Sequence, residues 1–290
     1  MSHLDYELVL FFNQFAHRSW TLDTFFLLCA CSPLLRGGTT AILIWWAWFK
    51  EGKDQRRNRE ILLYGIIASL CAVLVARTVT HVLPFRPRPI HNPGLVLRFA
   101  EGLSRKTLLN WSSFPSDHAA LFFTLAAILW LVSRRTGVLA TAQVLFLVCL
   151  PRVCLGLHYP GDILGGGVIG VSLAILGRSA TVRGLVAGPA LRWIDRHPQY
   201  FYATFFFLTY MIGMVFDPVP ELWSFAATVA RTGARRIHTL PVWTDIARMG
   251  WPVRIGLFLV AGSLLAIMLR SVWIRRHSRA YPALSPGATK

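Results

Sequence analysis

Residues 151–162 read Pro-Arg-Val-Cys-Leu-Gly-Leu-His-Tyr-Pro-Gly-Asp and separate two long apolar runs. Pro160 favours the first turn of a helix, so Asp162 is predicted to open a new helix, with His158 just outside it. A carboxylate four residues after a histidine can accept a hydrogen bond from one ring nitrogen and leave the other nucleophilic. Arg152 adds a planar guanidinium that suits phosphate oxygens. The stretch therefore predicts phosphate chemistry at the end of an apolar helix.

A second short motif, Pro115-Ser116-Asp117-His118, opens another apolar run. Ser116 or Asp117 can cap the helix that follows, and the free backbone amides at such a helix start favour an anion. His118 falls in the first turn, where it can protonate a departing oxygen and later activate water. Asp117 can be a cap that holds His118, or it can favour the protonated form of that histidine by proximity of charge. The sequence leaves both roles open.

A third region carries arginines at the end of the apolar run 61–83 and just beyond it. Arg77 and His81 are four residues apart and share one face of a helix. Prolines then break the helix, and Arg86 and Arg88 alternate with prolines, so their side chains are expected to point in different directions. One or both of these arginines can clamp a phosphate, and contact with lipid headgroups is the simpler alternative.

The composition places the chain among integral membrane proteins. Hydrophobic residues make up 54% of its 290 residues, more than an ordinary soluble domain contains. The formal net charge of +17 fits basic loops that hold the cytoplasmic side and touch anionic lipids, and we expect no nucleic-acid partner. The five cysteines lie in or near apolar runs and lack zinc-ligand spacing. We therefore expect no disulfide framework, no metal site and no cofactor.

The apolar runs predict an all-α integral membrane protein with eight spans. A short interfacial stretch is expected at 8–15, followed by spans at 20–35, 39–50, 61–83, 118–133, 138–153, 161–178, 199–216 and 251–270. Eight spans put the N-terminus on one side together with four basic segments: 50–60, 134–135, 178–197 and 270–279. The positive-inside rule makes that side cytoplasmic, so the three motifs are expected on the external side.

In this order and at span ends, the three motifs resemble those of the type 2 phosphatidic acid phosphatase superfamily. The family pattern is Lys-x6-Arg-Pro, then Pro-Ser-Gly-His, then Ser-Arg-x5-His-x3-Asp, and the match covers residues 77–162. The resemblance implies a six-helix catalytic core, a membrane lipid substrate and metal-independent hydrolysis through a phosphohistidine. It implies that His158 is the nucleophile, that Asp162 orients it and that His118 is the general acid and base. The phosphate-binding residues that it implies are Arg88, Ser116 and Arg152.

The chain departs from the family pattern at three positions. His81 stands at the first lysine, so a fixed positive charge becomes conditional, and Arg77 or Arg86 can supply that charge instead. Pro151 replaces the serine of the third motif, and Asp117 replaces the glycine of the second. A Pro-Ser-Asp-His motif together with His-Tyr-Pro-x-Asp is similar to the bacterial undecaprenyl-diphosphate phosphatases. That similarity favours a polyprenyl diphosphate as substrate.

The sequence is expected to divide into a membrane phosphatase core at 1–178 and an extension at 179–290. The extension has two predicted spans and a basic external loop at 217–250, which can cover an anionic headgroup or simply contact lipid. We expect a lipid phosphatase in a bacterial inner membrane, with its active site facing the periplasm or exterior. The sequence gives no indication of the oligomeric state.

Two other functions fit the same residues. A phosphotransferase would use the same intermediate with a lipid or sugar hydroxyl as acceptor in place of water. A non-enzymatic lipid transporter or binding scaffold would keep a degenerate site. His81 and Pro151 favour this last interpretation, and the intact pair of His118 and His158 argues against it.

Overall fold

The computed structural model describes residues 3–104 and 107–214, and all regular structure in these ranges is helical. The expected all-α class is confirmed for this part of the chain. The predicted loop at 217–250 and the predicted span at 251–270 lie outside the described residues. The elements are α1 (His3–Asn13), α2 (Trp20–Cys31), the π-helix η1 (Leu34–Gly38), α3 (Thr39–Phe49), α4 (Gln55–Val82), the 3-10 turn η2 (Pro89–His91), α5 (Asp117–Val132), α6 (Arg134–Gln143), the π-helix η3 (Val144–Cys149), α7 (Leu150–Cys154), α8 (Pro160–Leu176), α9 (Ala180–Arg196) and α10 (Pro198–Gly213).

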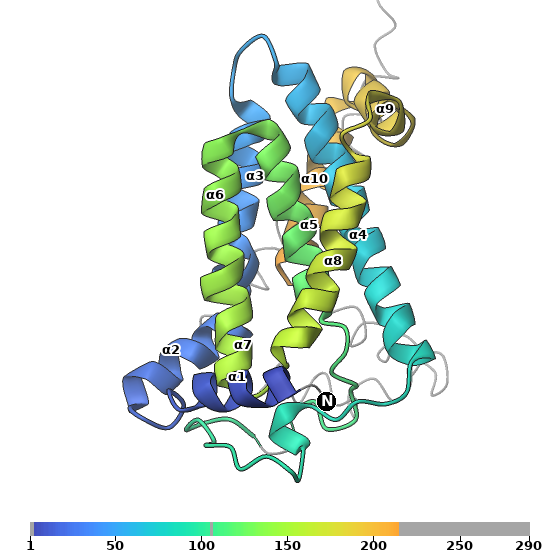
Figure 1. The fold of residues 1–290 in the computed structure, drawn as a ribbon. Helices are drawn as coiled ribbons and strands as arrows, with labels where there is room; N and C mark the ends of the chain where they lie inside the picture. The colour runs from blue at the N-terminus through green and yellow to red at the C-terminus, as the bar shows by residue number, and fades with distance from the viewer. Residues whose placement is uncertain (1–2, 105–106, 215–290) are drawn as a thin grey trace, which may run out of the picture. The chain divides into compact units, whose positions relative to one another are not determined.

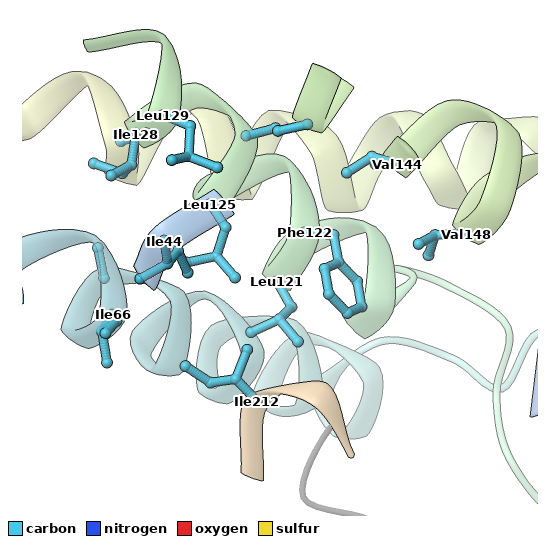
Figure 2. Close-up of a cluster of buried hydrophobic side chains, with 14 of the residues drawn as sticks. Ile44, Ile66, Leu121, Phe122, Leu125, Ile128, Leu129, Val144, Val148 and Ile212 are labelled. Atoms are coloured by element: carbon cyan, nitrogen blue, oxygen red, sulfur yellow. The ribbon is translucent and has the colours of Figure 1, made fainter. Parts of the chain in front are cut away.

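The helix α5 lies at the centre of the bundle and packs against α4, α6 and α8 (Figure 1). Apart from its first turn and Thr124, its sequence is apolar on every side, which is typical of a helix enclosed by others. Leu121, Phe122, Leu125 and Ile128 are all buried between neighbouring helices (Figure 2). This core fixes the N-terminal end of α5, where the second motif begins.

Glycines let α8 approach α5 at backbone distance. A Cβ atom on Gly166 would overlap the carbonyl oxygen of Ser116, and one on Gly170 would overlap that of Ala120. Small residues permit this kind of close helix contact in membrane bundles. As a result the start of α8 lies beside the start of α5, and the backbone N–H of Ser116 donates to the carbonyl of Asp162 at 3.0 Å. The second and third motifs therefore meet.

Two helical segments in the described part of the chain are long and apolar enough to cross a bilayer. By length and composition, α4 and the continuous run Arg134–Cys154 each qualify as a span. The number rises to four if each of two bent pairs counts as one span, α2 with η1–α3 and α8 with α9. Helix α5 is apolar but shorter, with 16 residues.

The prediction that the N-terminus lies with the basic segments is wrong. Helices α2 and α3 join through η1 at a bend of 63°, so they do not form the two separate crossings that were expected. Helix α1 packs against α7 and α8 at the end of the bundle where the motifs lie (Figure 1). There Asp5 accepts a hydrogen bond from Gly161 at 2.8 Å. The N-terminal helix is thus a neighbour of the motifs, and the three basic segments within the described residues, 50–60, 134–135 and 178–197, lie at the other end of α4, α5 and α8.

The basic segment 178–197 is not the loop that was expected, because most of it forms α9. Its first turn is capped by Ser179, whose hydroxyl accepts from the backbone N–H of Val182. One of its arginines, Arg183, donates to the carbonyls of Gly177 and Arg178 at 2.8 and 2.9 Å. The segment does lie beside 50–60 as predicted, because α9 packs against α4.

Candidate active site

His158 lies in the turn between α7 and α8 and is buried. Its Nδ1 is 3.0 Å from the carbonyl oxygen of Ser113 and 3.5 Å from Oδ2 of Asp162. A carbonyl oxygen can only accept, so Nδ1 carries the proton in this arrangement. Nε2 then presents its lone pair, and Nη1 of Arg88 lies 3.0 Å away. The turn thereby holds a nucleophilic nitrogen beside a guanidinium.

The surroundings of His158 keep its imidazole neutral. Burial lowers its pKa, and the positive charge of Arg88 lowers it further, while the carboxylate of Asp162 acts in the opposite direction. The net shift is downward from the ordinary histidine value near 6.5. At neutral pH Nε2 therefore carries no proton.

Arg88 is fixed by backbone carbonyls. Its side chain is buried, with 6% of its surface exposed. Nη1 donates to Leu157 at 2.7 Å, Nε to Trp111 at 3.2 Å and Nη2 to Ser112 at 3.3 Å. A guanidinium that three carbonyls already hold in place loses little conformational entropy when it binds a phosphate, and this suits a binding role.

Asp162 belongs to a chain of charged groups that reaches the N-terminal helix. Its Oδ2 accepts from the backbone N–H of Tyr159, and its Oδ1 accepts from Nη1 of Arg86, both at 2.7 Å. Nη2 of Arg86 in turn donates to Oδ2 of Asp5 at 2.7 Å. Arg86 was considered as a phosphate clamp or as a substitute for the family lysine. In the structure both ends of its guanidinium are occupied by carboxylates, so it positions Asp162 instead.

His118 is held by its neighbour Asp117, the residue that replaces the family glycine. Oδ1 of Asp117 accepts from the backbone N–H of His118 at 2.8 Å and lies 2.9 Å from its Nδ1. Oδ2 of the same carboxylate lies 3.4 Å from the guanidinium of Arg77. Asp117 therefore orients His118, and Arg77 is tied to this carboxylate. Ser116, and not Asp117, caps α5 by accepting from Ala119.

Two buried arginines lie on the other side of His118. Nη1 of Arg36 is 3.2 Å from Nε2 of His118. Arg152 donates from Nη1 to the carbonyl of Val148 at 2.8 Å and from Nη2 to that of Ala30 at 3.3 Å. Arg152 was expected to share a phosphate with His158, but the structure turns its guanidinium toward α2. There it lies close enough to Arg36 for the two charges to act on each other.

His81 lines a small hollow at the mouth of the site and is exposed. The hollow has a volume of about 30 Å³, and its other lining residues include Arg77, Arg88, Asp117 and His158. His81 can thus reach an anion in the hollow without holding any side chain of the site in place. Among residues 3–104 and 107–214, no group of three or more His, Cys, Asp or Glu side chains is arranged to hold a metal ion.

Sequence reasoning missed three contributors to this site. Arg36 lies in an apolar region without a motif, and Asp5 lies far from the motifs in the chain. Ser113 acts through its backbone carbonyl, which any residue could provide. Asp5 precedes the interfacial stretch predicted at 8–15, and its acidic side chain was the one weak signal available, because a buried acid needs a partner.

The three motifs all fall within a segment that matches a family model. Residues 61–183 match the model of the PAP2 superfamily. The chain contains a PAP2 superfamily domain. The domain holds every predicted site residue from Arg77 to Asp162, while Arg36 and Asp5 precede it.

The curated proteins similar to this chain carry names from membrane lipid metabolism and transport. The "Bacitracin transport permease protein BcrC" of Bacillus licheniformis is 29% identical over 119 residues, which are 41% of this chain and 55% of that protein. The "Lipid A 1-diphosphate synthase" of Escherichia coli (strain K12) is 28% identical over 140 residues, 48% of this chain and 56% of that protein.

A "Decaprenylphosphoryl-5-phosphoribose phosphatase" of Mycobacterium tuberculosis is 35% identical over 124 residues, 42% of this chain and 61% of that protein. The chain thus spans 55% to 61% of the length of these relatives. Among solved structures, LpxE of Aquifex aeolicus aligns with a TM-score of 0.42 at 25% identity, covering 61% of this chain and 99% of that one.

Proposed function

We propose that this chain is an integral membrane lipid phosphatase that works through a phosphohistidine. The observation that carries this proposal is the arrangement of His158, whose Nδ1 faces the Ser113 carbonyl while Nε2 lies 3.0 Å from Nη1 of Arg88. A nucleophilic histidine needs an unprotonated nitrogen, a fixed tautomer and a positive charge where the phosphoryl oxygens will lie. This turn supplies all three.

In the first step Nε2 of His158 attacks the terminal phosphorus, and the bond from phosphorus to the leaving oxygen breaks. The electron pair of that bond passes to the leaving oxygen, which takes a proton from Nε2 of His118. Asp162 and the Ser113 carbonyl stabilise the positive ring of His158 that forms on attack. Arg88 and the helix start capped by Ser116 balance the charge on the equatorial oxygens.

In the second step water attacks the phosphorus and the phosphorus–nitrogen bond breaks. The electron pair returns to Nε2 of His158, and His118 removes a proton from the attacking water. Asp117 supports both states of His118, because its carboxylate faces Nδ1 at 2.9 Å. The buried arginines carry the charge balancing, so we propose that no divalent ion takes part.

For the substrate we propose a polyprenyl diphosphate. The Pro-Ser-Asp-His and His-Tyr-Pro-x-Asp motifs favour it, and one relative is named as a decaprenylphosphoryl-5-phosphoribose phosphatase. The lipid tail would lie among the apolar helices, with the headgroup at the end of the bundle where His118 and His158 meet.

We also propose that this end faces the periplasm or exterior of a bacterial inner membrane. The basic segments 50–60, 134–135 and 178–197 lie at the opposite end of the bundle, and the positive-inside rule places such segments in the cytoplasm. Labelling of single cysteines introduced at Glu51 and at Val96, both exposed, would test this with a membrane-impermeant reagent on intact cells. Reaction at position 51 but not at position 96 would reverse the orientation.

A second candidate, a lipid phosphotransferase, keeps the same phosphohistidine. The name of one relative, lipid A 1-diphosphate synthase, favours it, because that name describes formation of a diphosphate. Product analysis separates the two functions, since hydrolysis yields inorganic phosphate and transfer yields a newly phosphorylated acceptor.

The first experiment measures phosphate release by the purified protein in detergent from undecaprenyl diphosphate, phosphatidic acid and phosphatidylglycerophosphate. His158→Ala should lower the rate by roughly 10⁴-fold, because the nucleophile is lost. EDTA should leave the wild-type rate unchanged. A rate that survives His158→Ala, or one lost to EDTA and restored by a single divalent ion, would contradict the mechanism.

A further inference from the structure

A buried arginine outside the three motifs reaches the second histidine. The side chain of Arg36 is 5% exposed, and its Nη1 lies 3.2 Å from Nε2 of His118. Burying a guanidinium among membrane helices is costly, so such a residue normally serves a substrate or ion path. None of the motifs that resemble the phosphatase family includes it.

An irregular backbone segment places Arg36 at this position. Arg36 lies in the π-helix η1, at the bend between α2 and α3. Nε2 of Gln143 donates to the carbonyl of Arg36 at 2.6 Å, and the hydroxyl of Thr40 donates to Oε1 of Gln143 at 2.7 Å. Short π-helical segments occur frequently at functional sites. These hydrogen bonds hold the bend and therefore fix the backbone position of Arg36.

Several charged side chains lie around the two histidines in the described part of the chain. Five arginines and three aspartates make up the described network: Arg36, Arg77, Arg86, Arg88 and Arg152 with Asp5, Asp117 and Asp162. Two of the aspartates are joined to Arg86, and the third faces both Arg77 and His118. These guanidinium groups are of the kind that binds the oxygens of a phosphate.

The contact between Arg36 and His118 involves the atom that a general acid must use. Nδ1 of His118 faces the Asp117 carboxylate, so Nε2 accepts from Arg36. We propose, on the basis of the phosphatase function above, that Arg36 binds the leaving phosphate of a lipid diphosphate. An oxygen of that phosphate lies between Arg36 and His118 and accepts from both. Its negative charge favours the imidazolium, which can then donate from Nε2.

Because the leaving groups differ in charge, Arg36 should favour a diphosphate substrate over a monophosphate. When Nε2 of His158 bonds to the terminal phosphorus of a diphosphate, the departing bridging oxygen belongs to a lipid monophosphate. That product keeps its negative charge, which Arg36 and the nearby Arg152 stabilise. A lipid monophosphate substrate releases a neutral alcohol after protonation by His118, and Arg36 has no charged group to bind.

The test compares a polyprenyl diphosphate with the polyprenyl monophosphate of the same chain length. Arg36→Gln should lower kcat/KM for the diphosphate roughly 30- to 100-fold more than for the monophosphate, because a charge-assisted hydrogen bond is lost. Arg36→Lys should recover part of the loss. Arg183→Gln is the matched control, since Arg183 is a buried arginine whose Nη1 bonds to backbone carbonyls at the other end of the bundle. Arg183→Gln should leave the ratio of the kcat/KM values for the two substrates unchanged.

Binding to the His158→Ala protein gives a readout that does not need turnover. Diphosphate affinity should fall when Arg36→Gln is added, and monophosphate affinity should change little. Equal losses for both lipids, or none, would overturn the role of Arg36. If the wild type releases no phosphate but binding still discriminates in this way, the proposed hydrolysis fails and the role of Arg36 stands.

Discussion

The two ends of the helix bundle use the same charged residue types in opposite ways. At the motif end, Arg86 joins Asp162 and Asp5 at 2.7 Å each, and the side chain of Asp162 is fully buried. At the far end, Arg56 lies 3.6 Å from Asp195, with side chains 76% and 58% exposed. The difference teaches that the Arg56–Asp195 pair at the far end remains solvated, while the network of Arg86, Asp162 and Asp5 at the motif end is ordered within the protein.

This difference has a physical cause and a functional consequence. Removing a charge from water costs several kcal/mol, so buried ions persist only where partners hold them at short distance. Exposed pairs incur almost none of this cost and gain little. The buried network keeps its groups in fixed places, and catalytic groups need such fixed geometry before the substrate arrives.

The largest expected effect comes from breaking the buried network at its central residue. Arg86→Gln leaves the carboxylates of Asp162 and Asp5 without their shared cation, and should lower the free energy of unfolding by about 2 to 3 kcal/mol. Arg56→Gln at the far end should change it by less than about 0.5 kcal/mol. Thermal or denaturant unfolding in detergent measures both variants.

A second substitution sharpens this test. Adding Asp5→Asn to Arg86→Gln removes one of the two carboxylates that have lost the Arg86 cation and should restore part of the lost stability. If Arg86→Gln and Arg56→Gln destabilised the protein equally, the contrast between the two ends would be wrong. Failure of Asp5→Asn to restore any stability would show that Arg86 acts through packing and not through charge.

Helix packing provides the next contrast. Gly166→Ala places a methyl group against the carbonyl of Ser116, so α8 must move away from α5. We expect a loss of about 1 to 3 kcal/mol and a roughly 10-fold lower kcat, because the start of α8 carries Asp162. Gly184→Ala in α9 is the matched control, since the nearest atom to its new methyl group is Oε1 of Glu60 at 3.9 Å. It should be neutral or slightly stabilising, and equal effects of the two variants would contradict this account.

The apolar patterning and the motifs predicted the helical class and the helix ends that bring His118 and His158 together. Those predictions succeed because a long apolar run must be helical in a membrane and because capping residues mark where it begins. Asp117 does not cap α5, since Ser116 does, but its carboxylate contacts His118, as both roles left open by the sequence require.

Contacts that depend on tertiary geometry could not be predicted in this way. Arg36 reaches His118 only because η1 interrupts the helix and bends the chain by 63°. The contact between His158 and residue 113 is made by a backbone carbonyl, so the type of side chain in the sequence does not indicate it. The position of the N-terminus was missed because hydropathy counts α2 as a crossing of its own, whereas α1 docks at the motif end through Asp5.

The smallest expected effect is on the pH dependence of kcat/KM and of stability, which His158 at the motif end should set and His197 at the far end should not. Burial and the charge of Arg88 lower the pKa of His158, so its Nε2 stays unprotonated until the pH falls below the ordinary value near 6.5. The acidic limb of kcat/KM should therefore lie below 6.5, and Arg88→Gln should move it toward higher pH.

The unfolded chain binds this proton first, so stability is also lost as the pH falls below 6.5, by at most about 1.4 kcal/mol per pH unit. His197→Gln, at an exposed position in the far end, should leave the limb in place. A limb at or above 6.5 in the wild type, or one that moves with His197→Gln, would mean that the buried surroundings of His158 do not set the protonation that limits the reaction.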